Sequence, residues 1–400
     1  MKTRHTLTAL ALVALSAGPA FAQRADVRIQ IDTEAIREVA QQARTAADEA
    51  RLVLRDVLRE VLGPEVRQDI ERDVRSAMRD FANVFDEMST WTWTDSRPTR
   101  QSRTFTATQN DTSTRSFPLG ANGHIDLQNF SGDVKVVAGS GREVTVDTIR
   151  TARGRTDTDA KTGLSRVRVD MTHRADRLTI RVVYPNERQQ AYSVNVAFVV
   201  TAPAGTNVTA STLSGDVSAT GIAGDLSLST TSGDVAITDA QRVTKARSLS
   251  GDVQLRNVSS DGLLEAGTMS GDVTATGIKA RRLSLESLSG DVTARDVNTG
   301  AADLRSTSGD VSFDGRLQTN GRYDFRSHSG SVRLAVDGSV GFTFEGQSFG
   351  GSVRSDLPLQ MRSVSTGSRR ISKSLNGTFG DGSATMTATS FTGDITIIKR

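Results

Sequence analysis

The stretches that decide the fold read LSGDVSA at 213–219, TSGDVAI at 231–237, LSGDVQL at 249–255, MSGDVTA at 269–275, LSGDVTA at 288–294 and TSGDVSF at 307–313. The same Ser-Gly-Asp-Val corner, or a near variant, recurs with its glycine at 132, 215, 233, 251, 271, 290, 309, 330, 351 and 393. After a first gap of 83, the spacings are 18, 18, 20, 19, 19, 21, 21 and 42 residues. A period near 20 residues indicates a solenoid.

Apolar residues keep fixed places around each corner glycine. The position two residues later is Val or Ile in every copy, and the position four residues later is apolar in all copies except Ser355. Upstream, apolar residues stand seven, five and two positions before the glycine, as in Leu283, Leu285 and Leu288. This alternation predicts two short strands per repeat, one on each side of the corner, with all of these side chains facing the interior.

Stacking such coils at about 4.8 Å pairs the backbone of each rung with its neighbours and buries a continuous apolar ladder. We therefore expect residues 205–400 to form a parallel β-solenoid of about nine coils, with one irregular coil between 356 and 382. Alternating segments at 142–150, 164–171, 177–184 and 192–201 predict an antiparallel strand insertion or cap within 118–204.

The chain in front of the repeats divides into three segments. Residues 1–22 have the pattern of a secretory signal with cleavage after Ala22. Residues 23–87 show helical periodicity interrupted by Gly63-Pro64, which predicts an antiparallel helical hairpin or a coiled coil. The apolar stripe could pack on the same chain or drive self-association. Residues 88–117 are rich in Ser and Thr and are expected to be an extended linker.

The composition excludes several classes of protein. The chain has no cysteine, so disulfides, thiol nucleophiles and cysteine-bound metals are ruled out. Without residues 1–22, 47 basic residues face 46 acidic ones, which argues against a nucleic-acid partner. Nothing after the signal reaches about 18 uninterrupted apolar residues, so we expect no transmembrane span. We also expect no cofactor.

The corner aspartates are the most regular polar feature. A ladder of carboxylates could hold a row of Ca²⁺, but the nonapeptides of calcium-binding β-rolls are missing. We expect instead that each carboxylate accepts hydrogen bonds from backbone N–H groups of the corner, and that glycine supplies a backbone angle or space. The structural corners are Gly132-Asp133, Gly215-Asp216, Gly233-Asp234, Gly251-Asp252, Gly271-Asp272, Gly290-Asp291, Gly309-Asp310 and Gly393-Asp394.

Other candidate sites have simpler explanations. Residues 346–350 match G-x-S-x-G, but that motif needs a strand-to-helix elbow, so no catalytic role is assigned to Ser348. His328 and Phe349 occupy an apolar slot of the repeat and are expected to be packed. Residues 150–181 carry nine basic residues against four acidic ones. They could bind anionic polysaccharide or lipid headgroups, or simply cover solvated strand faces. We expect no catalytic residues and no metal site.

The ladder of corners, the lead-in VVTAPAG at 199–205 and the closing FTGDITI at 391–397 resemble the bacterial putative-adhesin family of β-strand-repeat domains of unknown function. The resemblance covers residues 118–400 or so. It implies a right-handed β-helix-like fold on an exported protein and supplies no activity.

The sequence thus favours a non-enzymatic, exported binding module for a polysaccharide or protein of the cell envelope or surface, with the helical segment serving oligomerisation or attachment. A Gram-negative periplasm or the extracellular space is the expected location. One alternative is an envelope scaffold that polymerises end to end or serves in envelope stress, because solenoids need caps to stay soluble. Another is a polysaccharide-acting enzyme, for which no cluster of acids beyond the corners is found.

Overall fold

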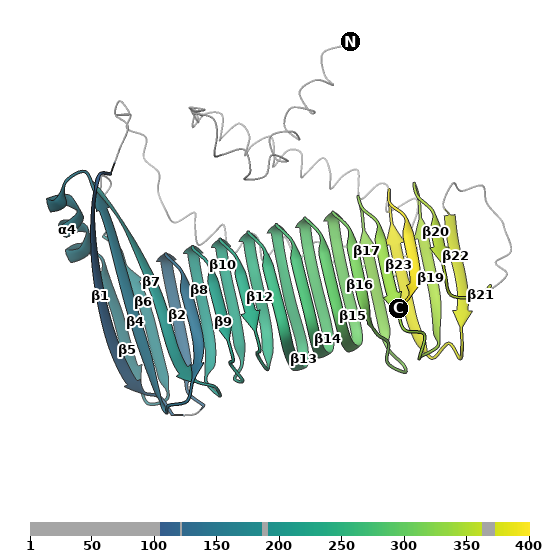
Figure 1. Cartoon of the computed structure of the whole chain (residues 1–400), viewed down its shortest axis with the longest axis horizontal. Helices are drawn as coiled ribbons and strands as arrows, with labels where there is room; N and C mark the ends of the chain where they lie inside the picture. Colours follow the sequence, from purple (N-terminus) through teal and green to yellow (C-terminus); the bar gives the residue numbers. More distant parts are fainter. Residues whose placement is uncertain (1–104, 121, 186–190, 362–372) are drawn as a thin grey trace, which may run out of the picture. The chain divides into compact units, whose positions relative to one another are not determined.

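The computed structural model describes residues 105–120, 122–185, 191–361 and 373–400, and shows a mainly β chain organised as a solenoid (Figure 1). The predicted signal segment 1–22 with its cleavage at Ala22, and the predicted helical segment 23–87, lie outside these residues. In the described part, no helix has the length and apolar character required to cross a bilayer.

The described residues contain one α-helix, α4 (Asp157–Arg166), and a single network of 24 paired strands. The strands are β1 (Ala107–Pro118), β2 (His124–Ser131), β3 (Val134–Gly139), β4 (Glu143–Gly154), β5 (Arg168–Arg174), β6 (Arg177–Val183), β7 (Tyr192–Pro203), β8 (Asn207–Ser214), β9 (Val217–Thr220), β10 (Leu226–Ser232), β11 (Val235–Thr238), β12 (Val243–Ser250), β13 (Val253–Ser270), β14 (Val273–Ser289), β15 (Val292–Ser308), β16 (Val311–Arg316), β17 (Arg322–Ser327), β18 (Val332–Val336), β19 (Phe342–Ser348), β20 (Val353–Ser355), β21 (Gln360–Met361), β22 (Lys373–Phe379), β23 (Ala384–Ser390) and β24 (Ile395–Lys399).

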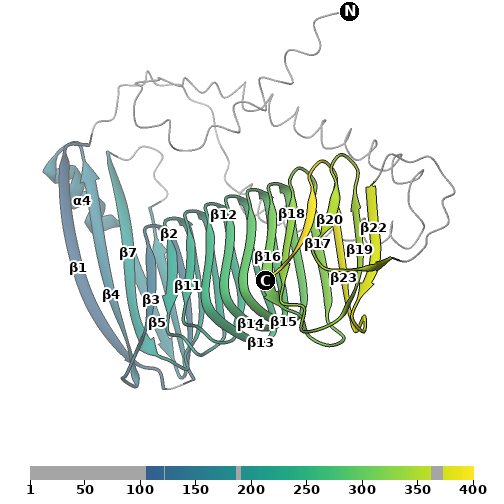
Figure 2. The same cartoon turned by 45° about the vertical axis from the view of Figure 1, so that its right-hand side comes forward.

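Parallel pairing in register stacks the corners directly over one another. Before the corner, Leu226 pairs with Val208 of the previous coil, and after the corner, Val235 pairs with Val217. The long strands β13, β14 and β15 run from the post-corner side of one coil into the pre-corner side of the next. Figure 2 shows the resulting stack of coils in chain order from β11 to β18. The expected parallel solenoid is confirmed.

In most coils the interior contains the side chains at the predicted positions seven and five before, and two and four after, the glycine. In the coil around Gly290, Leu283, Leu285, Val292 and Ala294 are all fully buried. Burying one such aliphatic side chain stabilises a fold by about 1.5–3 kcal/mol. Towards the C-terminal coils the core becomes aromatic, with Phe313 in ring contact with both Tyr323 and Phe325.

The expected burial of the position two before the glycine is wrong. Leu288 is 49% exposed, and His328, Phe349 and Phe391 also face solvent. Alternation explains the difference, because positions seven, five and three before the glycine share one face of the strand and position two lies on the other. The buried residue at position three is a small polar one, such as Ser287.

An antiparallel cap closes the N-terminal end of the solenoid. β1 pairs with β4 along its whole length, β4 pairs with β7, and β5 pairs with β6, all antiparallel. On their other edges, β6 pairs in parallel with β2, and β7 pairs in parallel with β3. β6 and β7 therefore add one coil to the stack, next to the coil that contains the Gly132 corner. Helix α4 begins at the N-cap Thr156 with a capping box to Asp159. Residues 107–117, which the sequence predicted as linker, are instead most of β1.

The C-terminal coils do not follow chain order. β23 pairs with β17 on one edge and β19 on the other, while β24 lies between β18 and β20. The last repeat of the sequence is therefore inserted between the two preceding repeats. β22 pairs antiparallel with β19 on one edge and with the short strand β21 on the other, where an irregular coil was expected.

Candidate binding trough

The corner aspartates form a continuous hydrogen-bonded ladder. In six successive steps, the backbone N–H of one corner aspartate donates to Oδ1 of the aspartate one coil earlier, at 2.8–3.0 Å. These steps run from Asp133 to Asp310, and Ser331 and Ser352 continue the pattern as donors to Asp310 and Asp394. The expected hydrogen bond from a corner N–H to the carboxylate is present, but the donor belongs to the corner of the neighbouring coil rather than to the same corner. At the far end, the two hydrogen bonds from the Ser352 N–H and hydroxyl lower the pKa of Asp394.

Glycine is needed at the corners for two reasons. Six corner glycines, from Gly132 to Gly290, have φ between 122° and 148°, a region that other residues rarely adopt. At Gly309, Gly330, Gly351 and Gly393 the backbone lies outside that region, but a Cβ would overlap the carbonyl oxygen of the neighbouring corner glycine. The need for space therefore holds at all ten corners, and the need for a special backbone angle holds at six of them.

A second ladder, which the sequence interpretation missed, lies inside the corner. Three positions before the glycine, a buried Ser or Thr hydroxyl donates to the carbonyl of the neighbouring corner glycine at 2.8–2.9 Å in eight coils. Ser287, for example, donates to the Gly271 carbonyl at 2.9 Å. The signal was present, because every copy has Ser, Thr or Asn at this position.

Ser348 belongs to this ladder. Its hydroxyl is fully buried, donates to the Gly393 carbonyl at 2.8 Å and accepts from the Gly351 N–H at 2.9 Å. The G-x-S-x-G match therefore holds a structural serine. His328 lies on the surface, where its ring stacks on Phe391 with 4.9 Å between centroids.

The basic segment 150–181 is divided by the fold. Arg150 is half-buried, pairs with Asp111 and donates to the carbonyls of Leu164 and Val167, at 3.1 Å each. It thereby connects β1, β4 and the end of α4. The other basic side chains of the segment are exposed on β4, on the connection from β4 to α4, and on α4, β5 and β6.

A trough of about 510 Å³ crosses four coils, where the chain leaves the post-corner strands. It forms where the chain bends, because Asn257, Gly277 and Asp296 have φ of 52°, 68° and 51° in three consecutive coils. Asn and Asp adopt this left-handed conformation more easily than other non-glycine residues. A Cβ on Gly277 would lie 2.8 Å from Oδ1 of Asn257, so a side chain at this position would displace the Asn257 amide.

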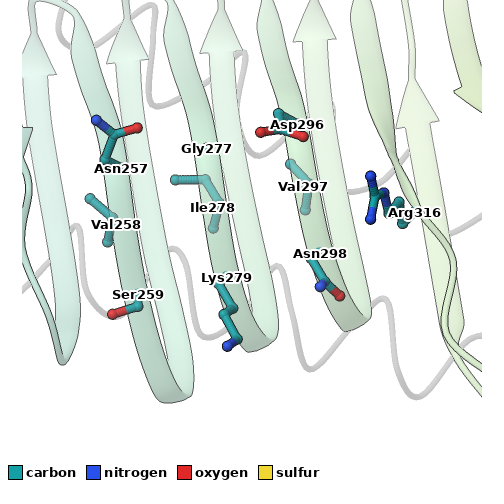
Figure 3. A pocket seen from close by; sticks show the side chains of 10 residues that line it. All are labelled: Asn257, Val258, Ser259, Gly277, Ile278, Lys279, Asp296, Val297, Asn298 and Arg316. Atoms are coloured by element: carbon teal, nitrogen blue, oxygen red, sulfur yellow. The ribbon is translucent and has the colours of Figure 1, made fainter.

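Three rows of residues line the trough (Figure 3). The bend residues form one row, the buried Val258, Ile278 and Val297 form the second, and Ser259, Lys279 and Asn298 form the third. Strand pairing places Ser259 beside Lys279, Lys279 beside Asn298, and Asn298 beside Arg316. Amide, hydroxyl and cationic groups thus follow one another at the rung spacing of about 4.8 Å.

The charges of the trough are partly balanced. Arg400, near the end of the chain, lies 3.6 Å from Oδ1 of Asp296 and 3.1 Å from Oδ1 of Asp314. Lys279 forms no ion pair with any described residue. Gln318 donates to Asn298 at 2.8 Å, and Asn257 donates to Asp239 at 3.0 Å, which fixes the side chains at both ends. The arrangement suits a hydroxyl-rich ligand that both accepts and donates hydrogen bonds.

The residues of the trough were not found from the sequence, although a signal exists. Six positions after the corner glycine, five consecutive copies carry Gly221, Asp239, Asn257, Gly277 and Asp296, and all five have positive φ. Glycine, aspartate and asparagine at a constant offset indicate a repeated left-handed bend.

The fold and the trough define a β-solenoid with an extended polar surface. The chain belongs to the Toastrack DUF4097 family, whose model matches residues 122–398, and this confirms the expected membership of a β-repeat family of unknown function. No curated protein has a matching sequence.

Several solved structures are similar at low identity. A "putative adhesin" from Bacteroides fragilis is 12% identical, with 72% of this chain and 97% of the other covered and a TM-score of 0.33. A "putative adhesin" from Parabacteroides distasonis is 12% identical with the same coverage and a TM-score of 0.36. A "putative lipid binding protein" from the same species is 11% identical, again over 72% and 97%, with a TM-score of 0.36.

Proposed function

We propose that this protein is an exported, non-enzymatic binding module that holds a polysaccharide of the cell envelope or cell surface in the trough. The observation that carries the proposal is the trough itself, where Asn257, Ser259, Lys279 and Asn298 present polar groups on neighbouring coils. An extended chain of sugars can follow such a row, because its hydroxyl groups repeat along its length as the polar side chains repeat along the coils.

The arrangement of the trough favours binding over catalysis. Glycoside hydrolysis requires a pair of carboxyl groups about 5–9.5 Å apart across the bond that is cleaved. The acidic residue that lines the trough is Asp296, and it is paired with Arg400. A general acid–base pair is therefore not provided by the lining residues.

The test is equilibrium binding of the mature chain to soluble envelope polysaccharides. Replacing Lys279→Ala and Asn298→Ala together is expected to raise Kd at least about tenfold, which corresponds to about 1.4 kcal/mol. Lys245→Ala with Gln254→Ala is the matched control, because both side chains are exposed and neither lines the trough. Equal binding by both double variants, or no saturable binding by the wild type, contradicts the proposal.

Export is a separate part of the proposal and rests on the signal pattern that ends at Ala22. Protease treatment of intact cells, compared with cells whose outer membrane has been opened, tests it. Digestion on intact cells supports a surface role, and digestion only after opening supports a periplasmic one. Resistance until the inner membrane is lysed contradicts export.

Attachment or oligomerisation through residues 23–87 completes the proposal, on the evidence of their helical periodicity. Deletion of this segment is expected to leave polysaccharide binding intact and to reduce the sedimentation coefficient or the envelope association. Unchanged sedimentation and unchanged association would contradict this role.

A further inference from the structure

An apolar ridge runs along the outside of the solenoid beside the corners. It consists of Leu213, Leu249, Met269 and Leu288, which stand two positions before the glycine in successive coils, with Thr231 in the same row. None of these side chains is buried, and Leu288 is 49% exposed. In-register pairing of the flanking residues, such as Thr230 with Thr212 and Ser270 with Ser289, aligns the row across five coils.

One flank of the ridge is strongly acidic. Three residues after each ridge position comes the corner aspartate, so Asp216, Asp234, Asp252, Asp272 and Asp291 follow the ridge coil by coil. One oxygen of each carboxylate accepts from the next corner. No described basic side chain forms an ion pair with any of the five. The row therefore presents a linear negative potential next to apolar surface.

The other flank is closer to neutral. Two and four positions upstream of the ridge residues, the charged side chains are Lys245, Arg247, Glu265 and Glu286. Arg247 lies 3.6 Å from Glu265. Two basic and two acidic side chains balance on this flank, so the net negative charge beside the ridge lies on the corner side.

We propose that the apolar ridge docks a basic amphipathic helix of a partner protein, aligned with the solenoid axis. The repeat of a helix is about 5.4 Å per turn, and the coils repeat at about 4.8 Å, so apolar residues one turn apart can meet successive ridge side chains over about four coils. Lysine or arginine on one side of the helix then meets the aspartate row. Apolar anchors supply affinity, and the charges select the partner and its orientation.

The geometry distinguishes this partner from a membrane. Anionic lipid headgroups attract basic surfaces, whereas the ridge is bordered by carboxylates. The straight row also suits a rod-like ligand about 19 Å long, which is the length of about 13 helical residues.

The experiment measures binding of the full mature chain to three synthetic 14-residue peptides by fluorescence anisotropy. One has leucine and lysine arranged for an amphipathic helix, the second has glutamate in place of lysine, and the third has the first composition in scrambled order. We expect micromolar binding of the first peptide alone, with a gain of helical circular dichroism on binding.

Two sets of substitutions separate the contributions of the ridge and the charge. Leu249→Ser, Met269→Ser and Leu288→Ser together are expected to weaken binding at least tenfold. Asp234→Asn, Asp252→Asn and Asp272→Asn together keep the acceptor oxygens, and are expected to weaken binding and flatten its dependence on salt. Because the first set changes half-buried or exposed side chains outside the core, thermal unfolding should stay close to the wild type.

The Lys279→Ala, Asn298→Ala variant is the control, because it alters the trough and should leave peptide binding unchanged. Equal binding of the glutamate peptide, loss of binding in this control, or no binding of the lysine peptide overturns the proposal. Ridge-dependent binding to phosphatidylcholine vesicles in place of the lysine peptide also overturns it, in favour of a lipid surface.

Discussion

The backbone N–H of Asp272 donates to Oδ1 of Asp252, one coil earlier, at 2.8 Å. The bond makes the aspartate a connector between coils, because the carboxylate of one corner fixes the backbone of the next. A hydrogen bond of this kind contributes about 0.5–1.5 kcal/mol. We expect Asp252→Ala to lower the free energy of unfolding by about 1 kcal/mol and Asp252→Asn to lower it by less than half as much, as measured by urea denaturation. Equal losses in the two variants would show that charge, rather than the acceptor oxygen, stabilises the corner.

A substitution at Gly271 tests the close approach of the corners. Gly271 has φ of 144°, and a Cβ there would overlap the carbonyl oxygen of Gly251. We expect Gly271→Ala to destabilise the protein by about 3 kcal/mol or more, because backbone strain and overlap act together. Gly262→Ala is the control, since a Cβ at Gly262 meets no atom within 4 Å. A similar, small effect of both changes would contradict the corner geometry.

The buried hydroxyl ladder makes a prediction at Ser287. Ser287 is 1% exposed, and its hydroxyl donates to the Gly271 carbonyl at 2.9 Å. Ser287→Ala should cost about 1–2 kcal/mol, because a buried acceptor loses its partner. Ser287→Thr should cost less than about 0.5 kcal/mol, since Thr230 and Thr268 fill the equivalent position and donate in the same way. Calorimetric unfolding of both variants measures these changes in stability. Wild-type stability of the Ser287→Ala variant would contradict a stabilising role of the hydroxyl ladder.

Two leucines of one strand test the assignment of faces. Leu285 is fully buried, whereas Leu288 is 49% exposed. Leu285→Ala should destabilise the fold by about 2–5 kcal/mol, and Leu288→Ala by no more than about 0.5 kcal/mol. Thermal unfolding of the purified variants provides the measurement. A larger loss of stability in Leu288→Ala than in Leu285→Ala would show that Leu288 faces the interior, as the sequence repeat suggested.

Tyr184 gives a pH dependence at high pH. Burial raises the pKa of its phenol to about 12, from the ordinary value of 10.0. Its ring lies 5.1 Å from that of Phe130, and its hydroxyl donates to the Val194 carbonyl at 3.2 Å. Because the folded state holds the proton more tightly, its contribution is complete below pH 10 and disappears as the pH rises towards 12. Burial also raises the pKa of Tyr323, so two tyrosines contribute.

Ultraviolet absorbance titration of the phenolate, combined with unfolding curves between pH 9 and 12, tests this expectation. Tyr184→Phe should flatten the loss of stability over that interval. An unchanged slope in the variant would show that Tyr184 titrates normally in the folded protein.

Much of the fold could be predicted from the sequence repeat, because the repeat restricts how the apolar side chains can be buried. The Val or Ile at position two after each glycine and the regular period of the corners leave few ways other than stacking to bury the apolar side chains. The wrong assignment of Leu288 arose because apolar character was followed across a break in the alternation, while the small polar Ser287 concealed the inward position.

Other features depend on contacts that a single chain sequence does not specify. The 42-residue gap before Gly393 is compatible with a last coil at the end of the stack or with one inserted between earlier coils. Pairing of β23 with both β17 and β19 shows that the coil is inserted. The trough depends on left-handed bends at Asn257, Gly277 and Asp296, whose side chains differ although their backbone angles agree. Composition alone therefore did not reveal the site.

The most direct test of the proposed function is hydrogen exchange of the mature chain with and without a soluble envelope polysaccharide that it binds. The proposal predicts slower exchange concentrated in residues 257–259, 277–279 and 296–298, with no such change in the Lys279→Ala, Asn298→Ala variant. Protection confined to other faces of the solenoid, or equal protection in the variant, would contradict binding in the trough.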